Sequence, residues 1–376
     1  MDLRDSPEEA AFRSEVREFI AQNLPEGAMR RGARRFEDDD RDWSRKLGAA
    51  GYAGLTWPKE YGGAGAPYTH QAIFLEEMAR AEAPSHLGVI GLGMAGPTII
   101  AWGTPEQKER YLAKILSADD IWCQGFSEPD AGSDLAAART RIEDKGDHFV
   151  VNGQKVWSSF AHIADFCILV GLGVPDAPRY RNLTYVIADM HAPGVEVRPL
   201  VQITGHPEFN EIFFTDVQVP KENLLGEVGG GWQVAMTTLL HERGTLGFAL
   251  SATLDVAVRK LVALAKERNV TDPILLDRIA REWIELQALK YTNYRALTTL
   301  QKTGIPGPEG SASKLVWSEA NQRLTKLAQE IAGGPGVDEY WTYQQLRSRG
   351  NTIEAGTSEI LLNIVAERVL GLPRSR

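Results

Sequence analysis

Short runs of β-forming residues occupy the middle of this chain, and runs with helical periodicity lie on both sides of them. Runs at 166–170, 184–188, 195–200 and 211–219 are separated by Pro, Gly and Asp residues, which is typical of short strands joined by turns. Asn152-Gly153 stands between further β-formers, a pattern that predicts a hairpin turn. We therefore expect a central β-domain of two small packed sheets over residues 119–227.

The flanking regions carry the apolar spacing and the end signals of helices. Ser6 and Pro7, followed by Glu9, indicate a helix start, and further helices are expected over 42–50, 70–83 and 105–117. Beyond 229–231, helices are expected over 232–267, 273–303, 311–332 and 358–370, with a Gly/Pro-rich break at 304–310. The predicted fold class is α+β, with an N-terminal α-helical domain (1–118), the central β-domain (119–227) and a C-terminal four-helix-bundle-like domain (228–376).

Composition excludes several classes of function. The 376 residues are 43% hydrophobic and carry a formal charge of -9, so nucleic acid and anionic membranes are not expected partners. The two cysteines and seven histidines show neither a disulfide framework nor the spacing of metal ligands. The first nine residues are acidic and lack the apolar core of a signal peptide, and no apolar run is long enough to span a bilayer. We expect a cytoplasmic protein.

Segment 125–134 places small, hydroxyl and turn-forming residues directly after an apolar run. An ordinary Pro-Gly loop explains this composition, since such residues are what turns need. A loop that follows a strand is also a common ligand site. The segment alone leaves both interpretations open.

Three segments together resemble the acyl-CoA dehydrogenase family: 127–134 (SEPDAGSD), 152–159 (NGQKVWSS) and 356–359 (GTSE). They occur in the family's order, and the helical–β–helical division agrees with it over essentially the whole chain. The resemblance implies FAD as cofactor. It places Trp157 against the isoalloxazine ring and Ser159 near N5, with a core indole beside a turn as the alternative for Trp157. The other implied cofactor contacts are Phe126, Ser127, Ser133, Ser158, Arg268, Gly333, Gly334, Gly356, Thr357, Ser358 and Glu359.

The chain departs from the family pattern near the diphosphate contacts. Segment 269–273 replaces the usual Phe-Gly after Arg268, Glu330 stands where a glutamine is common, and Phe126 replaces an aliphatic residue. An acid close to a diphosphate would repel it. Either the cofactor is held differently here, or this chain shares FAD with a non-identical subunit.

The catalytic base is expected on a helix. Removal of an α-proton from an acyl thioester requires a carboxylate, and the usual family position holds Ala355, with Glu354 one residue away. Some members, isovaleryl- and long-chain-type enzymes among them, carry the base in a Glu-Arg pair, which here is Glu242-Arg243. These are the only formal charges between 229 and 254, although an exposed helix stripe would also explain them. The resemblance implies substrate contacts at Ser133, Arg243 and Ala355.

The implied function is oxidation of an acyl-CoA to the trans-2-enoyl-CoA, with electrons passed to an electron-transfer flavoprotein. The chain would form a homodimer, a homotetramer or an α2β2 heterotetramer. Two alternatives stay open: a non-catalytic or FAD-sharing subunit of a heteromeric enzyme, and a flavin oxidase or monooxygenase on the same fold. Gly88, Gly91, Gly93 and Gly96 would either make room for a bulky acyl group or mark a loosely turned connection.

Overall fold

The computed structural model describes residues 4–25, 38–304, 307 and 309–374, without the side chains of 38–40, 242–246 and 309. The chain divides into two compact units. Unit 1 contains Met1–Arg34, Ala66–Pro84 and Arg243–Arg376, and unit 2 contains Arg35–Gly65 and Ser85–Glu242. The described residues include no helix of the length and apolar character needed to cross a membrane.

Unit 2 is built on one seven-stranded sheet, in which β5 pairs with β4 and the remaining order is β1-β4-β2-β3-β7-β6. The strands are β1 (Trp122–Gly125), β2 (Arg141–Asp144), β3 (His148–Ser159), β4 (Phe166–Leu172), β5 (Leu183–Asp189), β6 (Val195–Leu200) and β7 (Phe209–Pro220). The expectation of two small sheets is therefore corrected. Two halves, β5-β4-β1 and β2-β3-β7-β6, are joined through the pair Arg141 and Leu172. A Cβ on Gly171 would lie 2.4 Å from the carbonyl oxygen of Thr140, so this glycine lets the two halves meet.

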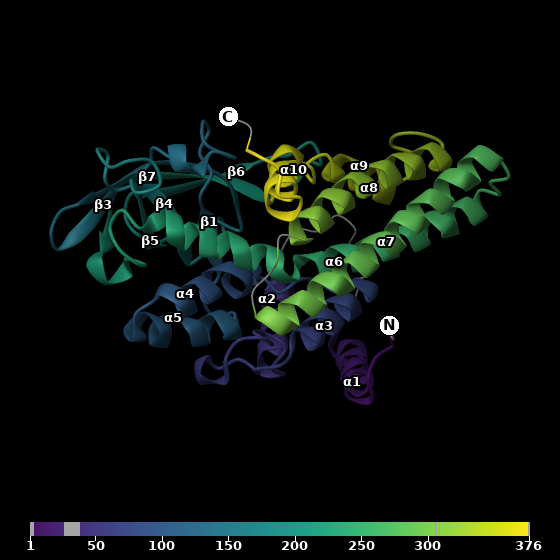
Figure 1. Ribbon diagram of the computed structural model, residues 1–376, viewed down its shortest axis with the longest axis horizontal. Helices are drawn as coiled ribbons and strands as arrows, with labels where there is room; N and C mark the ends of the chain where they lie inside the picture. The colour runs from purple at the N-terminus through teal and green to yellow at the C-terminus, as the bar shows by residue number, and fades with distance from the viewer. Residues whose placement is uncertain (1–3, 26–37, 305–306, 308, 375–376) are drawn as a thin grey trace. The chain divides into compact units, whose positions relative to one another are not determined.

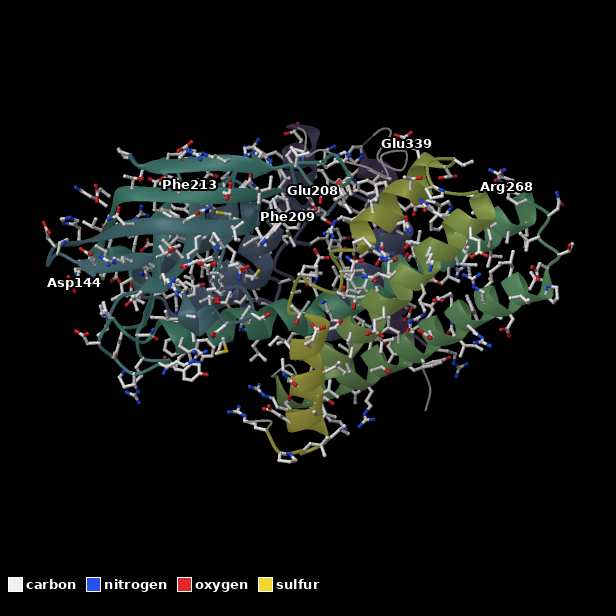
Figure 2. All side chains as sticks on the ribbon, turned by 90° about the horizontal axis from the view of Figure 1, so that it is seen from above. Asp144, Glu208, Phe209, Phe213, Arg268 and Glu339 are labelled. Atoms are coloured by element: carbon white, nitrogen blue, oxygen red, sulfur yellow. The ribbon has the colours of Figure 1, made fainter. Side chains whose placement is uncertain are left out.

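Asn152-Gly153 does not form the predicted hairpin turn. Strand β3 continues through it with a shift in register, a β-bulge. A Cβ on Gly153 would lie 2.6 Å from Thr140 Oγ1, and Asn152 exchanges two hydrogen bonds of 2.9 Å with Asp216 on β7. The turn into β3 lies instead around Gly146, at the opposite end of the sheet from Phe209 (Figure 2). A bulge and a tight turn both use Asn-Gly, so the dipeptide alone did not separate them.

Helices α2 (Asp38–Ala49), α4 (Gly96–Trp102) and α5 (Pro105–Ser117) also belong to unit 2. The glycine-rich segment before α4 is helical and not a loosely turned connection. Gly91–Ala95 forms a π-helical turn, and a Cβ on Gly96 would lie 2.1 Å from the ring of Trp57. Of the four glycines singled out, Gly93 alone has nothing within 4 Å of an added Cβ.

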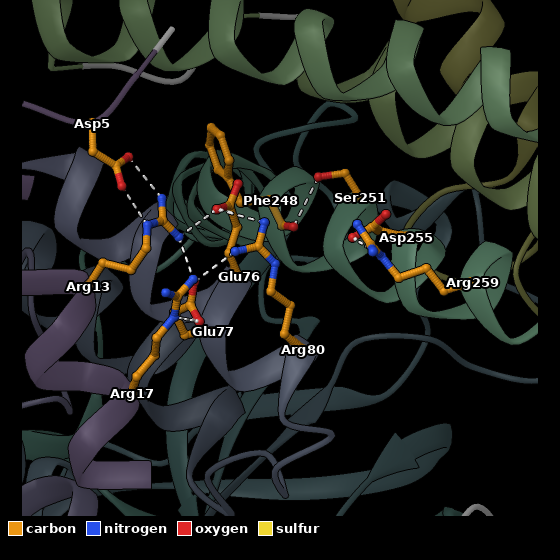
Figure 3. A network of polar contacts seen from close by, with 10 residues as sticks. All are labelled: Asp5, Arg13, Arg17, Glu76, Glu77, Arg80, Phe248, Ser251, Asp255 and Arg259. Carbon is orange, nitrogen blue, oxygen red and sulfur yellow. Dashed lines mark hydrogen bonds and ion pairs between the residues drawn. The ribbon is translucent and has the colours of Figure 1, made fainter. Parts of the chain in front are cut away.

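In unit 1, the helix predicted to start at Pro7 is α1 (Pro7–Asn23), and Ser6 caps it in a capping box with Glu9. It packs beside α3 (Tyr68–Arg80) (Figure 1). Arg13 reaches from α1 to Glu76 and Glu77 of α3 at 3.0 and 2.7 Å, and Figure 3 shows this network. Charge pairing thus fastens the first helix to unit 1.

The remaining helices of unit 1 form the predicted helical bundle (Figure 1). They are α6 (Gly231–Glu267, from Arg243 onward), α7 (Pro273–Thr303), α8 (Glu309–Ala332), α9 (Glu339–Ser348) and α10 (Ser358–Ile364). Apolar residues of α6, α7, α8 and α9 share one buried core, which includes Leu261, Leu286 and Leu324. Helix α9 was not predicted, and α10 passes into a π-helical turn, Val365–Val369.

Candidate functional site

The loop that follows β1 is held tightly against β3. Phe126 is buried, and its ring meets that of Tyr185 edge to face at 5.9 Å. The carbonyl oxygen of Phe126 accepts a hydrogen bond from Lys155 Nζ at 2.9 Å. The carbonyl oxygen of Ser127 accepts from the backbone amide of Val156, also at 2.9 Å. Both carbonyls therefore point toward β3.

A buried ion pair fixes the rest of this loop. Lys155 is fully buried, and its Nζ lies 2.8 Å from Glu128 Oε1. The carboxylate of Glu128 also accepts from the backbone amides of Arg139 and Thr140, at 2.7 and 2.9 Å. Burial alone would raise the pKa of Glu128, but attraction to Lys155 and these hydrogen bonds outweigh it and lower the pKa. Burial lowers the pKa of Lys155, against the opposing effect of Glu128.

Trp157 presents its ring to solvent from a bulge in β3. The register with β7 shifts between Lys155 and Ser158, and Trp157 has a left-handed backbone with φ of 61°. Its side chain is 59% exposed and touches Phe209 edge-on, with ring centroids 6.0 Å apart. An exposed indole on a strained backbone is typical of a functional position and not of a core residue. The alternative of a core indole is therefore wrong.

Ser158 points inward from the same bulge. Its hydroxyl is buried, and among the described residues it has no hydrogen-bond partner. Asn210, fully buried on β7, donates to the Ser158 carbonyl oxygen at 3.0 Å and lies 3.2 Å from His162 Nδ1. Ser159 pairs with Phe209 at the end of the strand. The bulge thus places Trp157 and Ser158 on opposite sides of β3, with Asn210 holding its backbone.

The outer part of the loop is open to solvent. Ser133 is exposed, and its neighbour Asp134 is paired with Arg179. Ser133 is therefore free to meet a ligand that approaches from solvent.

In unit 1, the segment before α10 is a shaped turn. Ala355 and Gly356 both have positive φ, 52° and 92°, and Lys314 Nζ donates to the Gly356 carbonyl oxygen at 2.8 Å. The Thr357 side chain caps α10 by accepting from the amide of Ile360. Ser358 has a buried hydroxyl with no partner in the described part of the chain, and Glu359 lies in the first turn.

Glu354 is engaged in structural contacts. Its carboxylate accepts from Arg347 Nη2 at 2.9 Å and from Asn351 Nδ2 at 2.7 Å. Donors from α9 and from the turn that follows it therefore hold this carboxylate in place. Ala355, the usual family position of the base, has no carboxylate at all.

Glu242 and Arg243 lie within α6, but their side chains are outside the described part of the chain. Three residues before Glu242, Leu239 packs against the buried core that contains Phe126 and Tyr185. The helix that carries Glu242 therefore shares a core with the loop after β1. The neighbouring His241 has a pKa lowered by burial.

The predicted diphosphate contacts lie at or just beyond the C-terminal ends of α6 and α8. Arg268 is exposed just beyond the end of α6 (Figure 2). Glu330 is paired with Arg278 at 2.7 Å. Gly333 and Gly334 both have positive φ, 108° and 120°, in the turn after α8.

These residues fit a flat, amphipathic cofactor. In unit 2 they offer an exposed indole, which suits one face of a flat ring. In unit 1 they offer the start of α10, where the Ser358 hydroxyl has no partner among the described residues and the amides of Ser358 and Ile360 are bonded to Thr352 and Thr357. Among the described residues, no group of three or more His, Cys, Asp and Glu is placed to hold a metal ion.

Sequence reasoning missed Lys155, Glu128 and Asn210. A signal existed for Lys155, because side chains alternate along a strand and Phe149 and Val151 face the core. The same alternation puts the lysine on the buried face. Its partner lies 27 positions away along the chain, and no local pattern indicates that pairing.

Three family profiles match the chain in order. "Acyl-CoA dehydrogenase, N-terminal domain" matches residues 6–119, "middle domain" matches 123–217 and "C-terminal domain" matches 229–370. The chain belongs to the acyl-CoA dehydrogenase family. Acyl-CoA dehydrogenases depend on FAD, so FAD is the expected cofactor and an acyl-CoA the expected substrate.

Individual acyl-CoA dehydrogenases resemble the chain over its whole length. Acyl-CoA dehydrogenase IpdE1 of Mycobacterium tuberculosis is 40% identical over 96% of this chain and 97% of the relative. The solved structure titled "Tcur3481-Tcur3483 steroid ACAD" superposes with a TM-score of 0.90 at 29% identity, covering 100% of both chains. The ChsE4-ChsE5 complex from Mycobacterium tuberculosis gives a TM-score of 0.87 at 28% identity, again covering 100% of both. The fold and the enzyme class are thereby established.

Proposed function

We propose that this enzyme oxidises an acyl-CoA to its trans-2-enoyl-CoA with Glu242 as the base that removes the α-proton, and passes the electrons to an electron-transfer flavoprotein. The observation that carries the choice of base is the engagement of Glu354 by Arg347 and Asn351. The neighbouring position, where the family usually carries the base, is Ala355 and has no carboxylate. Glu242 lies on a helix that shares a core with Phe126.

The residues of unit 2 would hold the ring of FAD. Trp157 offers its exposed face, and Phe126, Ser127, Ser158 and Ser159 line the adjoining loop and strand end. FAD, when bound, supplies the acceptor for the hydride that leaves the β-carbon. The protein must orient the thioester, remove the α-proton and exclude water.

Other residues would hold the far part of FAD and the substrate. The helix start at Thr357, Ser358 and Glu359, preceded by Gly356, would meet a polar part of the cofactor. The amide of Ala355 would donate to the thioester oxygen, which polarises the carbonyl as the α-proton leaves. Ser133 and Arg243 would contact the substrate, while Arg268, Gly333 and Gly334 are assigned to the diphosphate end of FAD.

Replacing Glu242 with Gln tests the base. The variant should retain FAD but lose bleaching of the flavin absorption on addition of an acyl-CoA, since an amide cannot accept the α-proton. Glu354→Gln is the matched control and should still bleach. Retained turnover in Glu242→Gln, or loss of bleaching in Glu354→Gln alone, would refute the assignment.

A steroid-type acyl group is the substrate class we favour. The support is the similarity to a structure whose title names a steroid ACAD, at a TM-score of 0.90. Bleaching rates with CoA esters of a straight chain, a branched chain and a steroid side chain would decide it. Faster bleaching by the straight-chain ester would contradict this choice.

An FAD-sharing role in an α2β2 enzyme is the second candidate. Glu330 replaces a common glutamine and is tied to Arg278, which leaves an acid at a predicted diphosphate contact. Two similar structures carry titles that name two polypeptides each. If the chain purified alone holds one FAD per subunit and turns over, a homodimer or homotetramer is supported and this candidate fails.

A further inference from the structure

Lys155 and Glu128 form a buried ion pair that the proposed chemistry does not use. Both side chains lie inside unit 2, with exposures of 0% and 8%. We propose that this pair is a positioning device, which holds the loop after β1 and the Trp157 bulge in the shape that receives the flavin ring. The inference rests on the proposed binding of FAD by these two segments.

Two hydrogen bonds from β3 set the direction of the loop backbone. Lys155 Nζ donates to the carbonyl oxygen of Phe126, and the amide of Val156 donates to the carbonyl oxygen of Ser127. Successive peptide groups are thus turned with their oxygens toward β3. This leaves the hydroxyl of Ser127 and the outer face of the loop for a ligand.

Glu128 closes the loop. Its carboxylate accepts hydrogen bonds from the amides of Arg139 and Thr140 and from Lys155 Nζ. The two ends of the loop are therefore drawn to one point. Charge-assisted hydrogen bonds are shorter and stronger than neutral ones, so one carboxylate can fix the geometry of this closure.

Lys155 also connects the loop to the bulge that carries the Trp157 indole. Lys155 faces inward immediately before the register shift that turns Trp157 outward. A displacement of Lys155 would move the bulge and the loop together. One buried side chain therefore relates the two segments that are assigned to the ring.

Energetics also favour a positioning role over a purely stabilising one. Burial of an ion pair carries a large desolvation cost, and a well-packed apolar pair of similar volume is often as stable. Stability of the core therefore does not explain why two charges are kept here. Their retention is explained by the directed hydrogen bonds, which apolar side chains cannot make.

The experiment compares Lys155→Met, Glu128→Gln and the double variant with the wild type. The full chain is stripped of FAD, and FAD is added back while its fluorescence is followed. Loss of the outer partner of a metal ligand typically weakens metal binding about 10- to 100-fold, and we expect the Kd for FAD to rise by a similar factor in each single variant. The visible circular dichroism and the midpoint potential of the bound flavin should also shift.

Arg13→Met and Glu77→Gln provide matched controls. They break a part-buried ion pair within the charge network of unit 1, with Arg13 and Glu77 at 14% and 4% exposure, and should lower thermal stability without changing the Kd or the dichroism. The double variant removes both buried charges, so we expect it to fold and still bind FAD weakly. A wild-type Kd and spectrum in any folded variant overturns the proposal. Failure of the double variant to fold also overturns it, because the pair is then required for the core.

The outcomes separate this inference from the proposed function. If the wild-type chain binds no FAD, the proposed function fails first. If the wild type binds FAD and the variants bind it equally well, only the positioning role fails.

Discussion

At the scale of single residues, Glu354 lies one position before the usual family position of the base, and its contacts are structural. Its contacts with Arg347 and Asn351 stabilise the turn before α10. Replacement by Ala removes the acceptor shared by the buried Asn351 and the partly exposed Arg347, and we expect the free energy of unfolding to fall by about 1–3 kcal/mol. Denaturant unfolding measures this loss. Bleaching of the flavin by substrate should persist in the folded variant, and its abolition would show that Glu354 is the base.

At Trp157, backbone strain and a ring contact have opposite effects on stability. Its left-handed backbone costs roughly 1–2 kcal/mol, which Gly would relieve. Gly would also lose the edge contact with Phe209, of about 0.5–1.5 kcal/mol. For Trp157→Gly we expect a free energy of unfolding without FAD within about 1 kcal/mol of the wild type.

The same variant should bind FAD about 5- to 150-fold more weakly, because ring stacking of roughly 1–3 kcal/mol is lost. Fluorescence titration with FAD measures the affinity. Phe at this position is the matched control and should retain most of it. Equal affinity in the Gly and Phe variants would remove the indole from the proposed ring site.

At the scale of elements, α6 and α7 meet closely at Gly247. Asn293 Nδ2 donates to the Gly247 carbonyl oxygen at 2.7 Å, and a Cβ at Gly247 would lie 2.9 Å from Asn293 Oδ1. Gly247→Ala should destabilise the protein by about 1–3 kcal/mol despite the better helix propensity of Ala. In an Asn293→Ala background the clash disappears, and the same change should stabilise by about 1 kcal/mol. Thermal or denaturant unfolding of the four proteins measures this coupling, and additive effects would contradict it.

Most elements were predictable because their end signals are local. Ser6 caps α1 as predicted, and α7 begins at Pro273, the predicted first residue. Asn152-Gly153 misled because a bulge and a hairpin turn use the same dipeptide, and the choice depends on Thr140 and Asp216, which lie elsewhere in the chain.

At the scale of the whole molecule, the candidate FAD residues come from both compact units. Phe126 and Trp157 belong to unit 2, and Gly333 and Gly356 belong to unit 1. Sequence segments predicted these positions because each segment is short and continuous. The pair of Lys155 with Glu128 could not be predicted in this way, since it depends on strand register.

Hydrogen exchange of the full chain with and without FAD tests the assignment at this scale. If the assignments are right, FAD should slow exchange in 126–128 and 157–159 of unit 2 and also in 356–359 of unit 1. A bound ligand raises the free energy needed to open the amides that it holds. At a hundredfold excess over Kd the increase is about 2.7 kcal/mol. Segment 266–272, with Arg268, and segment 330–334 report separately on the diphosphate end. Protection there in the chain purified alone would count against shared FAD. Protection in unit 2 without any in 356–359 would contradict the assignment of the α10 start to the cofactor.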